Sequence, residues 1–405
     1  MQQKNNIKRR NFIRLSAAGT AGMLLAPTVS QGSFADYNGR NPAVNKVIYR
    51  TLGKTGIKVP IISSGKVPVD NEKLTRAILD SGILHIDTAH SYHDGRNEEA
   101  LGKVLKDHNR KNFTIATKIK GPRDMDTGLF KEEATTEGFI KQFETSLERL
   151  GTNYVDILYL HGISAREAVL YEPALKALKT IKKQGKARFL GVSTHRNEPE
   201  VIQAAIDSNF YDIVLTAYNY QQNEIVDVKS AVKKAADAGL GVIAMKVMAG
   251  KDFHGKENKK PTNPIAALKW VLQDTNIHTA VLTFKTFDQL NKYFSVMENI
   301  GFTDQEKSDI ETDNTSGSIY CPGCGKCKDR CRAHLPVPDI MRAYMYLYGY
   351  RDLAMARELI VSLNLPDNIC NDCIDCPVEC IKKYDVKRKI MDVVRIKNIP
   401  KEFLI

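Results

Sequence analysis

The sequence predicts an α/β protein in which a (β/α)8 TIM barrel is followed by a small, mostly helical, cysteine-rich domain. Between residues 59 and 300, short apolar runs alternate with amphipathic segments, and eight such units fit a closed barrel. The G-x-G-x-x-G fingerprint of a doubly wound sheet is absent after the first run. All eight cysteines lie after residue 320. The expected parts are a leader over 1–35, a linker over 36–46, the barrel over 47–316 and the cysteine-rich domain over 317–405.

Residues 1–35 have the layout of an export leader. They carry five basic residues and no acidic one, then an apolar stretch from about Leu15 to Ala26 and a small-residue end at Ser33-Phe34-Ala35. The pair Arg9-Arg10, followed by Asn-Phe-Ile, resembles the twin-arginine motif. We therefore expect export of the folded chain by the twin-arginine machinery, to a periplasmic location. A disordered basic tail is the alternative.

The barrel elements follow in order. Residues 47–59, VIYRTLGKTGIKV, predict a β-hairpin around a Gly-Lys-Thr-Gly turn. The next eight apolar runs are short and rich in Val, Ile, Leu or Thr, which is typical of strands buried on both faces. These runs are residues 59–65, 84–89, 113–119, 155–162, 187–193, 212–219, 240–247 and 279–285. Helical patterns between them end at Gly82, Gly151, Gly185 and Gly239, where a left-handed cap costs little.

Composition argues against two other classes. Hydrophobic residues make up 42% and charged residues 26% of the 405, as in ordinary soluble domains. The formal charge of +12 includes the leader, and no basic stripe with interleaved aromatics occurs, so we expect no nucleic-acid binding. No run of 18 apolar residues occurs either, so we expect no permanent membrane span.

Four polar side chains come at or after the ends of predicted strands, where barrel chemistry takes place. Asp87 ends the second strand, Tyr92 lies in the loop after it, Lys118 ends the third and His161 ends the fourth. An ammonium lowers the pKa of a neighbouring phenol, so Lys118, held by Asp87, would make Tyr92 a general acid. His161 would orient a substrate carbonyl. Each residue alone is more often surface or packing, but the joint arrangement is specific.

The stretches YRTLGKTGIKV, IDTAHSYHDGRNEEALGKVL, LYLHG and FLGVSTH resemble the aldo/keto reductases over about residues 47–300. The resemblance implies NADP- or NAD-dependent reduction of an aldehyde, ketone or sugar carbonyl, or the reverse, with hydride from the nicotinamide and a proton from the tyrosine. It also implies that Ser193 holds the carboxamide, Tyr218 stacks on the nicotinamide and Lys285 faces the 2′-phosphate. The chain departs from the family at Thr194, Leu215 and Gln289, where Asn, Gln and a basic residue are usual, which leaves NADP against NAD open.

The cysteines form two copies of one pattern, CPGCGKCKDRC at 321–331 and CNDCIDCPVEC at 370–380. Three thiolates on a tight loop bind three irons of a cubane, and the fourth often ligates the other cluster. That rule assigns one 4Fe–4S cluster to Cys321, Cys324, Cys327 and Cys380, and a second to Cys370, Cys373, Cys376 and Cys331. The alternatives are a zinc site and disulfides. Zinc sites separate their C-x2-C pairs more widely, and disulfides between cysteines at x2 spacing would cross-link the fold poorly. We therefore favour iron–sulfur clusters.

The 38 residues between the two cysteine sets predict two helices. The pattern resembles helical two-cluster ferredoxin domains, and the whole tail resembles that of a bacterial aldo/keto reductase subfamily with fused ferredoxin modules. Arg332 and Ile381 stand where ferredoxin motifs usually have proline.

The sequence thus predicts an exported oxidoreductase with two iron–sulfur clusters, a small carbonyl or sugar-like substrate and a redox partner protein. An electron-transfer subunit with the barrel as docking scaffold is the alternative. Nicotinamides transfer two electrons at once and 4Fe–4S clusters transfer one. The clusters could therefore carry electrons to or from the barrel, or they could be purely structural. We expect loops 120–134 and 249–263 to set specificity.

Overall fold

The computed structural model describes residues 47–222, 224–248, 263–315 and 321–404, except residues 322, 328, 367 and 372. The expected leader and linker, and most of the loop 249–263, lie outside the described residues.

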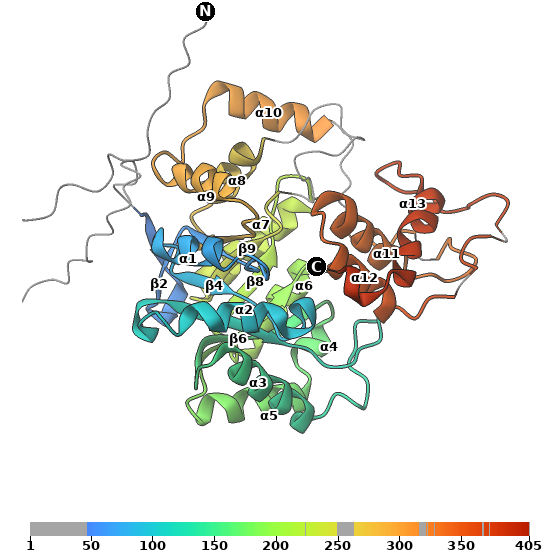
Figure 1. The fold of residues 1–405 in the computed structure, drawn as a ribbon. Helices are drawn as coiled ribbons and strands as arrows, with labels where there is room; N and C mark the ends of the chain where they lie inside the picture. Colours follow the sequence, from blue (N-terminus) through green and yellow to red (C-terminus); the bar gives the residue numbers. More distant parts are fainter. Residues whose placement is uncertain are drawn as a thin grey trace, which may run out of the picture. The chain divides into compact units, whose positions relative to one another are not determined.

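Eight parallel strands close into a barrel in the order β10-β3-β4-β5-β6-β7-β8-β9 (Figure 1). The strands are β3 (Ile62–Ser64), β4 (His85–Asp87), β5 (Thr114–Ile119), β6 (Val155–Ile163), β7 (Ala187–Thr194), β8 (Ile213–Ala217), β9 (Gly241–Met245) and β10 (Thr279–Leu282). Each lies within or overlaps one of the eight predicted runs, so the predicted barrel is confirmed.

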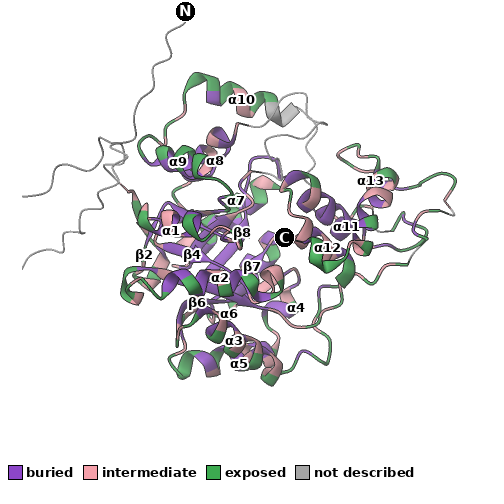
Figure 2. Ribbon diagram, in the orientation of Figure 1, coloured by how far each residue is buried: buried purple, intermediate pink, exposed green. Residues whose placement is uncertain are grey.

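Helices surround the strands and bury one face each. They are α1 (Glu72–Asp80), α2 (Arg96–Leu105), α3 (Thr136–Leu150), α4 (Arg166–Val169), α5 (Glu172–Lys183), α6 (Glu198–Ser208), α7 (Ile225–Asp237), α8 (Pro264–Gln273), α9 (Phe287–Phe294) and α10 (Asp304–Thr315). Figure 2 shows buried strands and helices that are exposed on their outer sides. In α3, for example, Phe139, Phe143 and Leu150 point inward at helical spacing.

The ends of α3 show why its boundaries fall where they do. The Thr135 side chain accepts a hydrogen bond from the Gly138 backbone N–H, which satisfies one free donor of the first turn. Gly151 has a φ of 62° and ends the helix in the left-handed conformation. The other three predicted stop glycines also have positive φ, as expected: Gly82, Gly185 and Gly239.

A hairpin closes the amino-terminal end of the barrel. Strands β1 (Tyr49–Thr51) and β2 (Lys58–Pro60) pair antiparallel, as predicted. Leu52 and Val59 pack inside the barrel in the same cluster as Tyr159. A Cβ on Gly53 would lie 2.4 Å from the backbone N of Gly241, so this close approach requires glycine. The carboxyl ends of the strands therefore form the accessible mouth.

The C-terminal segment has a hydrophobic core of its own. Helix α11 (Val337–Tyr344) continues into a π-helical turn over Met345–Gly349, and α12 (Leu353–Ser362) and α13 (Val386–Val393) follow. Ile340, Ile360 and Ile390 bring the three helices together in one buried cluster. The two helices predicted between the cysteine sets are therefore present.

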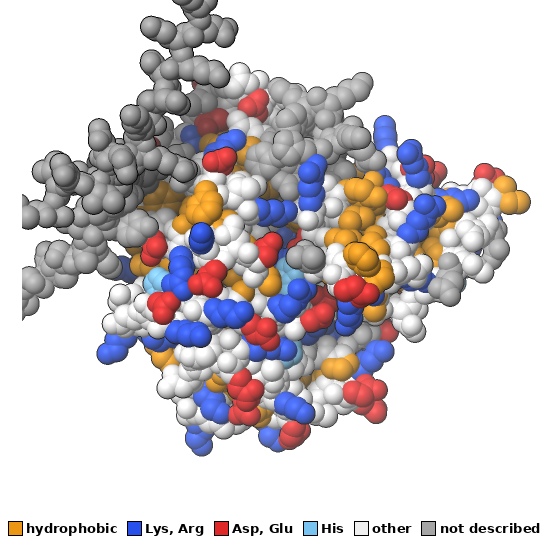
Figure 3. Space-filling model, viewed as in Figure 1, with side chains coloured by type: hydrophobic (Ala, Val, Ile, Leu, Met, Phe, Trp, Pro, Cys, Tyr) orange, Lys and Arg blue, Asp and Glu red, His pale blue; other side chains and the backbone are white. Residues whose placement is uncertain are grey.

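The barrel and the C-terminal helices differ in the side chains that they expose on one face of the molecule. On the face in Figure 3, Lys and Arg side chains alternate with Asp and Glu over the barrel, and hydrophobic side chains gather over the C-terminal helices. None of the helices in the part of the chain that the structure describes has the length and apolar character that a membrane span requires.

His85 gives the barrel an expected weakness at acidic pH. The side chain is fully buried in β4, neither ring nitrogen has a hydrogen-bond partner among the residues that the structure describes, and burial lowers its pKa to about 4. The unfolded chain binds this proton below about pH 6.5 and the folded chain only below about 4, so stability falls as pH falls through that range. We expect this histidine alone to cost about 2 kcal/mol between pH 7 and 5.

Thermal midpoints at pH 7 and 5 test this expectation. His85→Leu should show a smaller drop than the wild type, and His334→Asn, at an exposed position, should show the wild-type drop. An equal drop in wild type and His85→Leu would assign the acid sensitivity to other groups.

Candidate active site

The structure brings the four predicted polar side chains together at the carboxyl end of the barrel. Lys118 Nζ donates hydrogen bonds to Asp87 Oδ1 and, at 2.6 Å, to the carbonyl of Thr88. The same nitrogen lies 3.4 Å from Tyr92 Oη. The rings of Tyr92 and His161 meet edge to face with centroids 5.8 Å apart. Neighbouring parallel strands supply Asp87, Lys118 and His161, which is why residues far apart in the chain converge here.

A strained loop holds Tyr92 in position. The next two residues, His93 and Asp94, have φ of 53° and 55°, and Gly95 has φ of 93°. Such left-handed backbone in non-glycine residues persists only where the surroundings enforce it. The Arg149 guanidinium does so by donating to the His90 carbonyl at 3.0 Å, and it would collide with any Cβ at position 95.

Burial dominates the electrostatics of this group. It raises the pKa of Asp87 and lowers that of Lys118, and the attraction between the two groups opposes both shifts. Burial, followed by Asp87, also raises the pKa of Tyr92 well above its usual value. The prediction that Lys118 gives Tyr92 a lowered pKa is therefore wrong in direction. Burial lowers the pKa of His161 well below 6.5, so the imidazole is neutral at pH 7.

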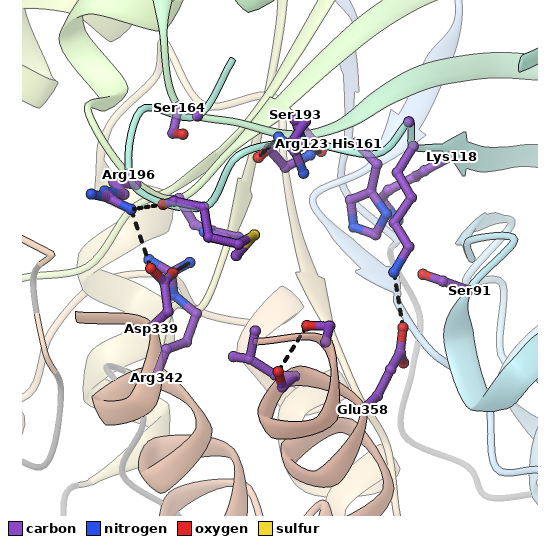
Figure 4. Close-up of a pocket in the computed structure, with 18 of the residues that line it drawn as sticks. Ser91, Lys118, Arg123, His161, Ser164, Ser193, Arg196, Asp339, Arg342 and Glu358 are labelled. Carbon is purple, nitrogen blue, oxygen red and sulfur yellow. Dashed lines mark hydrogen bonds and ion pairs between the residues drawn. The ribbon is translucent and has the colours of Figure 1, made fainter. Parts of the chain in front are cut away.

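A cavity of about 700 Å³ opens from this group toward the C-terminal helices. Figure 4 shows Lys118 and His161 on one side of it, and Arg196, Asp339 and Arg342 on the other. Residues 120–125, 128 and 131 form part of its wall, so the predicted specificity loop 120–134 does border the site.

A second, smaller cavity of about 180 Å³ begins at Asp87 and Tyr92 and follows the ends of β8, β9 and β10 to Lys285. This groove is the candidate cofactor site. Ser193 lies beside the tetrad, lines the larger cavity and accepts a hydrogen bond from the Gly162 N–H at 2.8 Å. Lys285 lines the groove, but its Nζ donates to the backbone carbonyl of Tyr350 in the C-terminal segment.

Tyr218 does not lie where the sequence suggested. It lines neither cavity, and its hydroxyl donates to Asp274 Oδ2 at 2.5 Å beside the ring of Trp270. The side chain is completely buried in the outer core. This hydrogen bond and packing hold the ring away from the mouth, so the prediction that Tyr218 stacks on a nicotinamide has no support in this arrangement.

The C-terminal segment supplies one wall of both cavities. Among the described residues, four ion pairs connect it to the barrel mouth: Lys66–Asp352, Lys120–Glu358 at 2.9 Å, Arg196–Asp339 at 3.3 Å and Lys401–Asp94 at 3.9 Å. Tyr346 borders both cavities, and its hydroxyl lies 3.1 Å from Lys246 Nζ.

The cysteines fall into two neighbourhoods. Cys321, Cys324, Cys327 and Cys380 line one small cavity together with Tyr384. Burial raises the pKa of Cys321 to about 12, and the neighbouring Cys327 and Cys380 add to the rise. Burial raises the pKa of Cys370 to about 11, with Cys331, Cys373 and Cys376 adding to it.

This grouping joins each x2-x2 triplet to the last cysteine of the other set. Within the described residues, no three His, Cys, Asp or Glu side chains are arranged to bind a single metal ion. The four sulfur donors around one enclosed space are the kind of ligand set that a cubane requires, because each of its irons takes one thiolate. Iron–sulfur ligation stays a prediction.

Sequence reasoning missed several residues of the large cavity. His195 and Arg196 follow β7 directly, and Lys246 follows β9, so the strand-end criterion that selected the tetrad applied to them as well. Asp339 and Arg342 carried no comparable signal, because their place at the mouth depends on how the C-terminal helices dock.

The fold and the converging side chains define a barrel oxidoreductase that acts on carbonyl groups. Residues 63–264 match the aldo/keto reductase family, and the chain belongs to that family. It is therefore an aldo/keto reductase-type oxidoreductase, from a family that reduces carbonyl compounds with NAD(P).

Individual relatives are distant. L-glyceraldehyde 3-phosphate reductase of Escherichia coli (strain K12) is 24% identical over 329 residues, covering 67% of this chain and 93% of that protein. L-galactose dehydrogenase of Arabidopsis thaliana is 28% identical over 225 residues, covering 51% of this chain and 67% of that protein. Among solved structures, the holo form of aldo-keto reductase AKR11C1 from Bacillus halodurans matches with a TM-score of 0.54 and 20% identity, over 66% of this chain and 96% of that one. That likeness shows the fold.

Proposed function

We propose that this chain is an exported NAD(P)-dependent reductase of aldehyde, ketone or sugar carbonyls, or the corresponding dehydrogenase, with two attached 4Fe–4S clusters. The observation that carries the proposal is the contact of Lys118 with both Asp87 and Tyr92 at the edge of a cavity that His161 also lines. This arrangement provides a proton donor, a cation and a neutral imidazole around one point.

The roles follow from the charges. Tyr92 keeps its proton at neutral pH because burial raises its pKa, so it serves as donor to a carbonyl oxygen that becomes an alkoxide. Lys118, 3.4 Å away, stabilises the phenolate that remains, and Asp87 holds Lys118 in place. His161 is neutral and donates a hydrogen bond to the carbonyl without a charge of its own.

The groove beside the tetrad has the position and the basic side chains that binding of a nicotinamide cofactor requires, at Lys66, Lys246 and Lys285. When bound, a nicotinamide supplies the hydride for the carbonyl carbon. Ser193, which lines the larger cavity beside this groove, is the group we assign to the carboxamide, and Lys285 in the groove is the group we assign to a 2′-phosphate. Lys285 already donates to the Tyr350 carbonyl, so phosphate recognition needs this lysine to exchange partners.

The eight cysteines are proposed to hold the two clusters in the cross-connected sets described above, inserted in the cytoplasm before twin-arginine export to the periplasm. Support comes from the shared cavity of Cys321, Cys324, Cys327 and Cys380 and from the paired arginines of the leader.

Anaerobic purification of the full chain tests the function. We expect bound NAD(P) to be released on denaturation, and added NADPH or NADH to be oxidised by members of a panel of aldehydes, ketones and aldoses. No retained nicotinamide and no turnover with either cofactor would contradict the reductase. Reoxidation of dithionite-reduced clusters by carbonyl plus NAD(P) would support electron transfer between the clusters and the barrel site. If no reoxidation occurs, the clusters are structural and do not transfer electrons to the barrel.

A further inference from the structure

The large cavity has a basic corner that begins beside His161 and ends at α11. Arg123 enters from the loop after β5, Arg196 from the end of β7 and Arg342 from α11. Arg196 and Arg342 are only 9% and 8% exposed, so the corner is largely shielded from water. Figure 4 shows Arg196 and Arg342 on either side of Asp339, with Arg123 beside His161.

One carboxylate serves more than one arginine at this corner. Asp339 is shared, with Oδ2 3.3 Å from Arg196 and Oδ1 3.4 Å from Arg342. Glu198 is buried, and burial raises its pKa to about 7, against the effect of Arg342 among others. Asp124 borders the cavity, but its Oδ1 accepts hydrogen bonds from Asp126 and Thr127 of its own turn.

Arg123 is the most informative of the three. Its Nη1 donates to the Gly162 carbonyl, and it forms no ion pair with any carboxylate among the described residues. Burial lowers its pKa to about 10, so the guanidinium is still charged at pH 7. Asp339, which already pairs with Arg196 and Arg342, also attracts Arg123, while Arg342 repels it. One carboxylate is therefore shared by three guanidinium groups, and a bound anion would offset their mutual repulsion.

Two histidines beside the arginines each have a ring nitrogen with unused hydrogen-bonding capacity among the described residues. The Nδ1 atoms of His161 and His195 are buried and have no hydrogen-bond partner among the described residues. A ligand that reaches from His161 toward the arginines would pass both imidazoles. The cavity volume of about 700 Å³ lies within the range of small-molecule sites.

We propose that Arg123, Arg196 and Arg342 form a subsite for an anionic group of the substrate, a carboxylate or a phosphate, while the carbonyl lies at Tyr92 and His161. This inference rests on the proposed reductase function. Guanidinium groups bind both anions through paired hydrogen bonds. Since Arg342 comes from α11, the C-terminal segment completes the substrate site as well as carrying the cysteines.

The rival explanation is that these arginines only dock the C-terminal helices on the barrel. Arg123 separates the two explanations, because its hydrogen bond goes to Gly162 of the barrel and, among the described residues, Asp339 of α11 attracts it without forming an ion pair. We therefore compare wild type, Arg123→Met and Arg342→Met with Arg395→Met, which removes an exposed arginine of the same segment.

Three aldehydes of one scaffold provide the probes: 4-carboxybenzaldehyde, 4-formylphenyl phosphate and the neutral methyl 4-formylbenzoate. In the wild type we expect kcat/KM for at least one anion to exceed that for the ester by about tenfold to a hundredfold. Arg123→Met and Arg342→Met should each reduce that ratio about tenfold or more, mainly through KM, and Arg395→Met should retain it. The preferred anion distinguishes carboxylate from phosphate. No preference in the wild type, or a preference that survives Arg123→Met, overturns the subsite.

Binding of unreactive anions separates this inference from the reductase itself. Calorimetric titration of the holoprotein with 4-methylbenzoate and with inorganic phosphate needs no turnover. Binding that weakens about tenfold or more in Arg123→Met supports the subsite even if no aldehyde is reduced, in which case only the proposed function fails. Turnover of aldehydes without binding of either anion overturns the subsite and leaves the reductase standing.

Discussion

Tyr92→Phe is expected to lower kcat for carbonyl reduction by about a hundredfold to ten-thousandfold. The change removes the hydroxyl that lies 3.4 Å from Lys118 Nζ and keeps the ring that packs against His161. The site therefore loses its proton donor but not its shape, and the alkoxide must take a proton from water. Steady-state turnover of a carbonyl found active in the wild type gives the rate, and fluorescence titration with NADPH checks that cofactor affinity is retained.

Tyr346→Phe is the matched control, because Tyr346 also borders both cavities but contacts Lys246 instead of Lys118. Its effect on kcat should be far smaller than that of Tyr92→Phe. If the two variants exchange these behaviours, the proton comes from the C-terminal segment and Tyr92 is wrongly assigned.

Paired cysteine substitutions should separate the two proposed clusters. Cys321→Ser with Cys380→Ser removes two ligands from the same neighbourhood, so the double variant should keep about half of the wild-type iron. Cys373→Ser with Cys380→Ser removes one ligand from each neighbourhood and should keep little iron. Iron and acid-labile sulfide are measured on anaerobically reconstituted full-length protein.

The outcome decides between two ways of connecting the ligands. If each cluster were held by one contiguous motif, the two double variants would exchange their iron contents. The variant at Cys373 and Cys380 would then keep about half of the iron, and the variant at Cys321 and Cys380 would keep little. Equal loss in both double variants would contradict either connection.

The sequence predicted where the tetrad side chains lie along the strands, but it did not predict how burial and neighbouring charges would shift their pKa values. Asp87, Lys118 and His161 could be found because neighbouring parallel strands end at the same side of a barrel. The raised pKa of Tyr92 could not be predicted in this way. It depends first on burial and, among other groups, on Glu358 and Asp352, which approach from the C-terminal helices. Spacing in the chain gives no measure of that approach.

Tyr218 shows a different limit of sequence reasoning. It follows β8 directly and so satisfies the strand-end criterion, but its hydroxyl is bound to Asp274 and its ring packs in the outer core. The sequence gives a residue's place along a strand, whereas the direction of a side chain just beyond the strand depends on which partner it finds. Arg342 illustrates the converse, since only docking brings it to the mouth.

Two of the ion pairs between the barrel and the C-terminal helices, Lys120–Glu358 and Lys66–Asp352, differ in how ionic strength should act on them. Side chains of Lys120 and Glu358 are 43% and 34% exposed, whereas those of Lys66 and Asp352 are 12% and 13% exposed. Dissolved ions screen accessible charges within a Debye length of about 8 Å at 0.15 M and act much less on shielded pairs. Rising salt should therefore loosen the end of α12 near Glu358 before the end near Asp352. The helices would then hinge open on one side, and the large cavity would become wider while the groove beside Lys66 stayed closed.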